Sequence, residues 1–197
     1  LMELATNAGE LGLWSRDLAK GEVWANPPLR TLFGFSQHES LQLNDLLVYI
    51  HPDDRTRVAY DVENAQLAGM PFEGEFRIIP PDGRERWVVA RGKTVSEARG
   101  MRRVGVVLDI TERKRAEERF RLAVEASPNA IVMFDEQAKI LLVNALTQEL
   151  FGYSREELIG ESVEILVPER FRAGLPAHQA AFFAAPQARA MGAGRDL

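Results

Sequence analysis

Residues 26–39 read NPPLRTLFGFSQHE, and residues 144–157 read NALTQELFGYSREE. Both stretches fit the pattern N-x5-LFG-[FY]-S-x2-E. When the chain is superimposed on itself with an offset of 118 residues, positions 4–39 contain ten identities in 36 aligned positions. Self-similarity at a fixed spacing is the mark of a repeated structural unit. The sequence therefore contains two copies of one domain.

Each copy begins with the pattern of a β-hairpin, in which two short apolar strands flank a turn. The expected strands are 11–15 and 22–25 in the first copy, and 130–135 and 140–143 in the second. An asparagine follows each hairpin and suits the N-cap of a helix, which is expected to end at Gly34 or Gly152. Ser36 with Glu39, and Ser154 with Glu157, predict capping boxes for a further helix in each copy.

The first copy continues with HPDDR at residues 51–55, where the proline and the acidic pair suit the start of a helix that reaches about residue 68. Three longer strands are expected after it, at 72–79, 84–95 and 103–110. The order of two strands, helices and three strands predicts an α+β domain with an antiparallel sheet and helices on one face.

These motifs together resemble the PAS domain family. The resemblance rests on the repeated pattern, on HPDDR, and on VVLDITERK at residues 106–114, which is similar to the segment after the last PAS strand in bacterial sensors. It implies a five-stranded antiparallel sheet whose helical flank encloses a ligand-sized cavity, present here twice. It also implies the sensory and dimerisation region of a bacterial signalling protein, most often a sensor histidine kinase. A ligand-free dimerisation scaffold of a diguanylate cyclase or a transcriptional regulator is the alternative.

The expected organisation has three parts: a first domain at 1–111, a connecting helix at 112–126 and a second domain at 127–197. A helical lead-in is expected at residues 1–8. The second copy reaches Leu197 before the last two strands of its pattern, which predicts that a parent protein continues beyond this residue with an output domain.

Composition excludes several classes of function. The 197 residues contain no cysteine, so disulfides, thiolate metal sites and a covalent cysteinyl chromophore are excluded. A net charge of −5 gives no reason to expect nucleic acid as a partner, and no apolar run is long enough for a membrane span. No catalytic motif is present, so this segment is not expected to be an enzyme. It is also expected to be a homodimer in the cytoplasm.

Candidate ligand-binding residues cluster in the first copy. An aromatic wall with one cation could orient a non-covalent flavin or a small organic ligand, although a chain without any cofactor is favoured. These pocket candidates are Trp14, Trp24, Asn26, Trp87 and Arg91. Alternation places Trp87 and Arg91 on one face of their strand, and the sequence leaves open whether that face points inward.

Metal or haem ligation would need one of three histidines. His38 is expected in solvent and His51 at a helix entry. His178 lies near the position that a haem ligand takes in oxygen-sensing PAS domains, but the matching residue is Leu175, so a haem-based gas sensor is the weaker alternative and no metal is expected.

The connecting helix is the expected signalling element. Asp109 or Thr111 is expected to cap it, and the predicted transmission residues are Asp109, Ile110, Thr111, Glu112, Ala116, Phe120 and Ala123. The last three form a narrow apolar stripe at helical spacing, which predicts pairing with the same helix of a second chain. A solvated spacer helix is the other interpretation, and Glu117–Arg121 is an expected ion pair on its surface.

Overall fold

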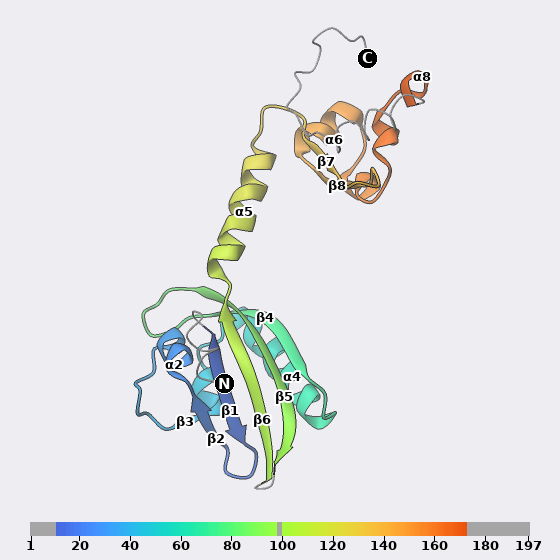
Figure 1. Cartoon of the computed structure of the whole chain (residues 1–197). Helices are drawn as coiled ribbons and strands as arrows, with labels where there is room; N and C mark the ends of the chain where they lie inside the picture. Colours follow the sequence, from blue (N-terminus) through green and yellow to red (C-terminus); the bar gives the residue numbers. More distant parts are fainter. Residues whose placement is uncertain (1–10, 98–99, 173–197) are drawn as a thin grey trace. The chain divides into compact units, whose positions relative to one another are not determined.

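The computed structural model describes residues 11–97 and 100–172 (Figure 1). The chain divides into two compact units, residues 1–117 and 118–197. Helix α5 (Thr111–Glu125) begins in the first unit and ends in the second. The expected helix at 112–126 is thus present within one residue at each end, while the expected lead-in at residues 1–8 lies outside the described residues.

The first unit is built on an antiparallel sheet, which within the described ranges has six strands in the order β3-β2-β1-β6-β5-β4. The strands are β1 (Gly12–Asp17), β2 (Glu22–Ala25), β3 (Leu41–Gln42), β4 (Phe72–Ile78), β5 (Arg86–Glu97) and β6 (Gly100–Asp109). Five of these are the predicted strands, and β3 is a two-residue addition at the edge. The predicted α+β architecture is confirmed.

Helices cover one face of this sheet (Figure 1). They are α2 (Pro27–Phe33), α3 (Leu43–Leu47) and α4 (Pro52–Leu67). Their apolar side chains pack on the inward residues of the strands, with Leu29 and Val58 among the most deeply buried. On β5, Val88 and Ala90 belong to this core, so the alternating residues Trp87 and Arg91 lie on the outer face.

One predicted helix start in the first unit is wrong. Glu39 accepts a hydrogen bond from the Ser36 amide, as the capping pattern implies, but no helix begins at Ser36. The buried Arg30 guanidinium donates instead to the carbonyls of Ser36 and Glu39 at 2.7 and 2.9 Å, which holds this segment as a turn. The next helix, α3, begins after Gln42.

The second unit opens with a hairpin and continues with short helices. Its elements are β7 (Val132–Phe134), β8 (Ile140–Val143), α6 (Ala145–Phe151), α7 (Arg155–Leu158), the 3₁₀ helix η1 (Val163–Leu166) and α8 (Glu169–Arg172). Ile140, Val143 and Leu158 form its small core. Here the predicted capping box of Ser154 and Glu157 is present and starts α7.

The repeated asparagine has the same structural role in both units. The Asn26 Oδ1 accepts hydrogen bonds from the amides of Leu13 and Leu29, and so joins β1 to α2. Asn144 makes the equivalent bonds to Ile131 and Thr147. The helices that these residues cap end at Gly34 and Gly152, whose φ angles of 77° and 76° are in the left-handed region that glycine adopts without strain.

Candidate functional site

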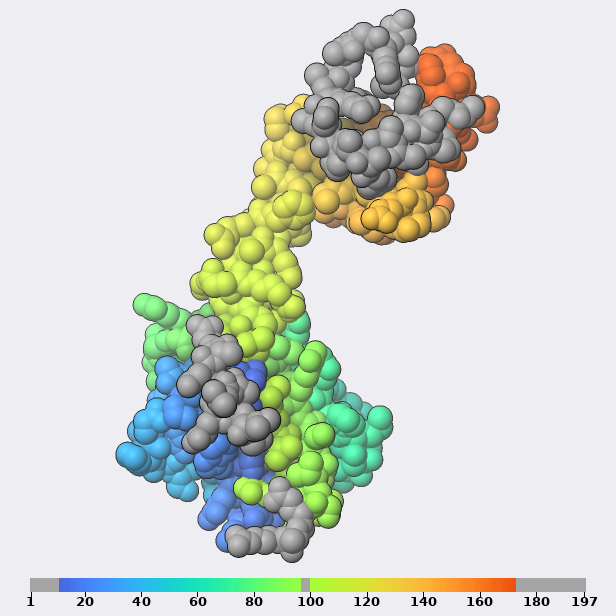
Figure 2. Space-filling model, viewed as in Figure 1, coloured from blue at the N-terminus to red at the C-terminus, as the bar shows by residue number. Residues whose placement is uncertain are grey.

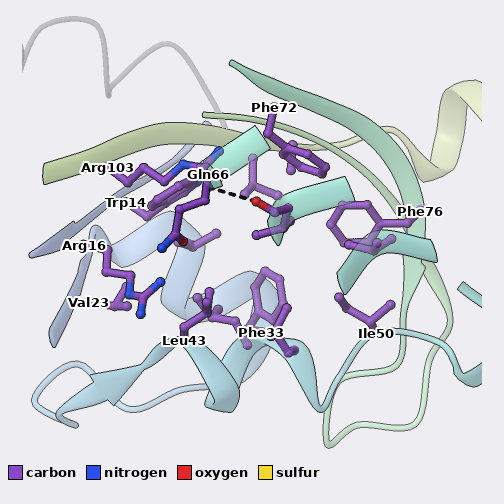
Figure 3. A pocket seen from close by; sticks show the side chains of 17 residues that line it. Trp14, Arg16, Val23, Phe33, Leu43, Ile50, Gln66, Phe72, Phe76 and Arg103 are labelled. Carbon is purple, nitrogen blue, oxygen red and sulfur yellow. Dashed lines mark hydrogen bonds between the residues drawn. The ribbon is translucent and has the colours of Figure 1, made fainter. Parts of the chain in front are cut away.

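An internal cavity of about 90 Å³ lies between the inner face of the sheet and the helices of the first unit. Figure 3 draws the 17 side chains that line it. Most of them are apolar and come from five strands and all three helices, among them Phe33, Phe72, Phe76 and Ile50. A cavity in this place is what the family resemblance implies, but its volume is below the roughly 300–1,000 Å³ of pockets for drug-sized ligands.

The polar lining is confined to Arg16, Gln66 and Arg103, which lie at one end of the cavity, away from Phe76 and Ile50 (Figure 3). Arg16 and Arg103 are paired across β1 and β6, so both side chains project from the same face of the sheet. Arg103 is only 3% exposed, and its Nη1 donates to the carbonyl of Val62 on α4 at 3.1 Å.

The charges at this end of the cavity are not neutralised within the described part of the chain. Among the described residues, no carboxylate forms an ion pair with Arg16 or Arg103, and three buried nitrogen atoms, Nε of Arg16 and Nε and Nη2 of Arg103, have no hydrogen-bond partner. Burial, and secondly the charge of Arg16, lower the pKa of Arg103.

The structure brings only one of the predicted pocket residues into the cavity. Trp14 lines it, with its indole ring over Gly92 and Gly105 on the neighbouring strands. Asn26 is a buried structural cap. Trp24, Trp87 and Arg91 do not line the cavity, because alternation along β2 and β5 turns them to the outer face of the sheet.

Trp24 and Arg91 belong instead to a broad depression on that outer face. It has a volume of about 820 Å³ and is also lined by residues of β1 and β6. Arg91 is exposed there and forms an ion pair with Glu73 at 2.6 Å. Because the Arg91 charge already has a partner, it is a weaker candidate for anion recognition than Arg103.

Sequence reasoning missed Arg16 and Arg103, although a signal was present. Each shares a strand face with small or apolar residues: Arg16 with Gly12 and Trp14, and Arg103 with Gly105 and Val107. An arginine at an inward position of such a strand is unusual, because a buried charge is costly unless something pairs with it.

The start of α5 is fastened to β5. Thr111 is the first helical residue, and its Oγ1 accepts a hydrogen bond from the Trp87 amide at 3.0 Å. The Ile110 amide donates to the Trp87 carbonyl at 2.8 Å. Asp109 acts as the cap, since its carboxylate accepts hydrogen bonds from both the amide and the hydroxyl of Thr111.

A charged cluster holds the first turns of the same helix. Lys114 and Arg113 form ion pairs with Glu75 on β4 at 2.7 and 2.5 Å, and these hydrogen bonds lower the pKa of Glu75. The Lys114 ammonium also lies 5.2 Å from the centre of the Trp87 ring. The outward Trp87 therefore contacts helix α5 and does not line the cavity.

The middle of α5 is exposed (Figure 2), including the predicted stripe of Ala116, Phe120 and Ala123. Phe120 is 52% exposed, which is high for a large apolar side chain. The expected Glu117–Arg121 ion pair is not formed. Arg121 donates instead to both oxygens of Glu118, and Glu117 lies 3.7 Å from Arg113.

The last turn of α5 is anchored within the second unit. Val124 is buried, and its carbonyl accepts a hydrogen bond from the Asn144 side chain at 3.2 Å. Glu125 accepts bonds from Arg155 and from the Ala145 amide, and these lower the pKa of its carboxyl group. Asn144 thus ties the end of the helix to the hairpin of its unit.

The histidines offer no described metal centre. In the described ranges, no group of three or more histidine, cysteine, aspartate or glutamate side chains could hold a metal ion. His38 is exposed, His51 caps α4 by accepting a hydrogen bond from the Asp53 amide, and His178 lies outside the described residues. None of the cavity-lining residues is a histidine, so this lining offers no imidazole ligand for a haem iron.

Family models of the PAS fold match the chain twice, over residues 22–107 and 118–192. A solved structure, the sensory box histidine kinase/response regulator from Burkholderia thailandensis, is 28% identical to this chain with a TM-score of 0.51, and the match covers 62% of this chain and 93% of that chain. In the part of the chain that the structure describes, no helix has the length and apolar character needed to cross a membrane.

The curated relatives include a sensor protein and a light-activated histidine kinase. The sensor protein FixL of Bradyrhizobium diazoefficiens is 30% identical over 81% of this chain, and the non-motile and phage-resistance protein of Caulobacter vibrioides is 32% identical over 76%. A blue-light-activated histidine kinase of Brucella ovis is 28% identical over 59%. The matches span 33%, 19% and 23% of these relatives, so this chain corresponds to a third or less of each.

Proposed function

Because this chain belongs to the PAS family, with two PAS domains in tandem, we propose that its first domain senses a small molecule and that α5 relays the signal to the second domain. The observation that carries this proposal is the hydrogen-bonded junction of Thr111 with Trp87. It attaches the helix to a strand whose inward residues, such as Ala90, line the cavity.

The coupling is mechanical. β5 and β6 both line the cavity; β6 ends directly before α5, and the beginning of β5 is hydrogen-bonded to the first residue of α5. A ligand that displaces either strand would move the hydrogen-bonded first turn and with it the angle or register of the helix. Because ligands act by differential affinity for two states, the relay needs a helix with two arrangements of similar free energy.

The exposed stripe of α5 supplies that bistable element in our proposal. Ala116, Phe120 and Ala123 would pair with the same residues of a second chain in a parallel homodimer. The output would be a histidine kinase in the cytoplasm, as the names of the kinase relatives suggest. We assign no catalytic step to the residues of this chain.

Disulfide trapping tests the pairing of α5 with the same helix of a second chain. The chain has no cysteine, so single substitutions Ala116→Cys, Phe120→Cys and Ala123→Cys report one position each. The matched control is Glu118→Cys, which lies about 200° around the helix from Ala116. We expect cross-linked dimers at the three stripe positions and little at Glu118. Equal yields at all four, or none at the stripe, would contradict helix pairing.

The relay is tested by filling the cavity without any ligand. Ala90→Leu adds three carbon atoms to the inner face of β5. Val89→Leu, the control, adds one methylene group to the outer face of the same strand. We expect Ala90→Leu to change the relative cross-linking yields along the stripe and Val89→Leu to leave them as in the parent chain. An unchanged pattern in Ala90→Leu would rule out coupling between the cavity and α5.

A further inference from the structure

We propose that the cavity of the first domain binds a small carboxylate with an apolar body, whose charged group pairs with Arg103 and Arg16. This inference rests on the proposed sensory function and names the chemical class of its ligand. It is carried by the guanidinium groups of the buried Arg103 and the half-buried Arg16, which lie with Gln66 at one end of a cavity whose other lining residues are apolar.

The free edge of Arg103 has the geometry that a carboxylate needs. Its Nη1 is held by the carbonyl of Val62 on α4, which fixes the plane of the guanidinium. The two nitrogens without a partner, Nε and Nη2, form one side of that plane and present two parallel N–H groups. Such a pair of donors matches the two oxygens of a carboxylate.

The same chain shows this edge in use. Nε and Nη2 of Arg77 donate to the two carboxylate oxygens of Asp54, at 3.0 Å each. The same two atoms of Arg103 have no carboxylate from the described residues against them, and the Arg103 side chain is among those that line the cavity. A ligand carboxylate would make at Arg103 the contact that Asp54 makes at Arg77.

Arg16 strengthens the preference for an anion. It is the cross-strand partner of Arg103, and its buried Nε also has no partner. Like charges placed directly opposite each other on a sheet destabilise it, and a buried charge without a counterion is costlier still. One anion between the two guanidinium groups would relieve both costs. At the offset of the repeat, the second domain has Phe134 in place of Arg16, so this site belongs to the first domain.

The size and lining of the cavity define the rest of the ligand. Phe76 and Ile50 lie at the other end from the arginines, and Phe33 and Phe72 lie between the two ends (Figure 3). A cavity of about 90 Å³ admits only a small ligand. A benzoate or a hexanoate has this size, with one carboxylate and an apolar body.

The test compares benzoate with benzamide, which has the same shape without the charge, and adds hexanoate and sulfate at constant ionic strength. All three tryptophans lie in the first unit, so the midpoint of thermal unfolding by tryptophan fluorescence reports on this unit. We expect benzoate and hexanoate to raise the midpoint and to shift the ¹H–¹⁵N signals of the Arg103 and Arg16 Nε–H groups. Benzamide and sulfate should do neither.

Variants then separate the cavity from the outer face. Arg103→Met should weaken benzoate binding at least about tenfold, and Arg16→Met should weaken it less. If Arg103→Met does not fold, Arg103→Lys serves in its place, because it keeps the charge and loses the paired donors. Arg91→Met removes an arginine from the outer face of the same sheet and should bind benzoate as the parent chain does.

Several results would overturn the inference. These are equal effects of benzoate and benzamide, an effect of sulfate as large as that of benzoate, no response to either carboxylate, or loss of binding in Arg91→Met but not in Arg103→Met. The relay is judged separately. If benzoate binds while the α5 cross-linking pattern of Ala90→Leu is unchanged, the relay is wrong and the ligand class stands. If the pattern changes while benzoate does not bind, the ligand class is wrong and the relay stands.

Discussion

The hydroxyl oxygen of Thr111 accepts a hydrogen bond from the Trp87 amide, and the Trp87 ring in turn lies 5.2 Å from the Lys114 ammonium, one turn further along α5. The helix is therefore held by the backbone of β5 at its first residue and by a side chain of β5 at its fourth. Thr111 is buried, so water cannot replace the hydrogen bonds of its hydroxyl group.

Thr111→Val keeps the shape of this side chain and removes the bond. We expect the free energy of unfolding of the first unit to fall by about 1–2 kcal/mol, because the Trp87 amide loses its acceptor. Urea unfolding followed by tryptophan fluorescence measures it, and faster hydrogen exchange at the Trp87 amide locates it. Thr31→Val, on the exposed surface of α2, is the control and should change stability by less than about 0.5 kcal/mol. If the two variants were equally stable, Thr111 would not hold the helix to the sheet.

The ion pair between Asp54 and Arg77 makes the first unit sensitive to acid. Hydrogen bonds from the Arg77 side chain lower the pKa of Asp54 from 3.8 to about 2. Because the pKa is lower in the folded state, the stabilisation is complete above the unfolded value and is lost as the pH falls from about 4 through about 2. Asp54→Asn should cost about 1–2 kcal/mol at pH 7, since the charged Arg77 then keeps only its longer contact with the Asp53 carboxylate, at 3.4 Å.

Urea unfolding at a series of pH values checks this effect, with Asp61→Asn as the matched control. Asp61 lies on the same helix, is more exposed and stands 3.7 Å from Arg57, so its loss should matter little. The difference in stability between Asp54→Asn and the parent chain should shrink as the pH falls toward 2. A difference that is constant with pH would show that the Asp54 carboxylate does not titrate with folding.

Local chemistry in the sequence predicted much of the fold. Asn26, Asn144, Gly34 and Gly152 act at helix ends, where the requirements of the backbone are set by one or two residues, and their repetition identified the two domains. The start of α5 was predicted for the same reason. Ser36 shows the limit of this reasoning, because Arg30 of the preceding helix binds the backbone carbonyl that the capping pattern would have placed at a helix start.

The cavity could not be predicted in the same way. Alternation along β5 fixed that Trp87 and Arg91 share a face, but which face points inward depends on where the helices pack. Arg16 and Arg103 lie far apart in the sequence and meet only through the pairing of β1 with β6. Aromatic residues were expected to mark the pocket, whereas the structure places two of the three tryptophans outside it.

Asn144 should be the most sensitive polar residue of the second unit. It is fully buried and takes part in five hydrogen bonds, three that its Oδ1 accepts and two that its amide donates. Asn144→Ala leaves these partners unsatisfied, so we expect a loss of more than about 2 kcal/mol. Hydrogen exchange of the β7 and β8 amides measures it. Asn129→Ala is the control, because the bond from Asn144 goes to the Asn129 carbonyl, which the substitution keeps. Similar protection in both variants would contradict the role of the repeated asparagine.

Gly105 should tolerate no side chain, because Trp14 needs the space above it. A Cβ atom at Gly105 would lie 2.2 Å from the Arg91 carbonyl oxygen and 2.5 Å from the Trp14 ring, and backbone atoms cannot move aside as a flexible side chain can. Gly105→Ala should therefore destabilise the first unit by more than about 2 kcal/mol and alter the fluorescence of Trp14. Gly74→Ala is the matched control on β4, where the nearest atom, 3.1 Å away, is the end of the Phe72 ring. Trp14 lines the cavity, so a stable Gly105→Ala variant with unchanged fluorescence would mean that the indole does not lie flat on the sheet and that the cavity wall is formed differently.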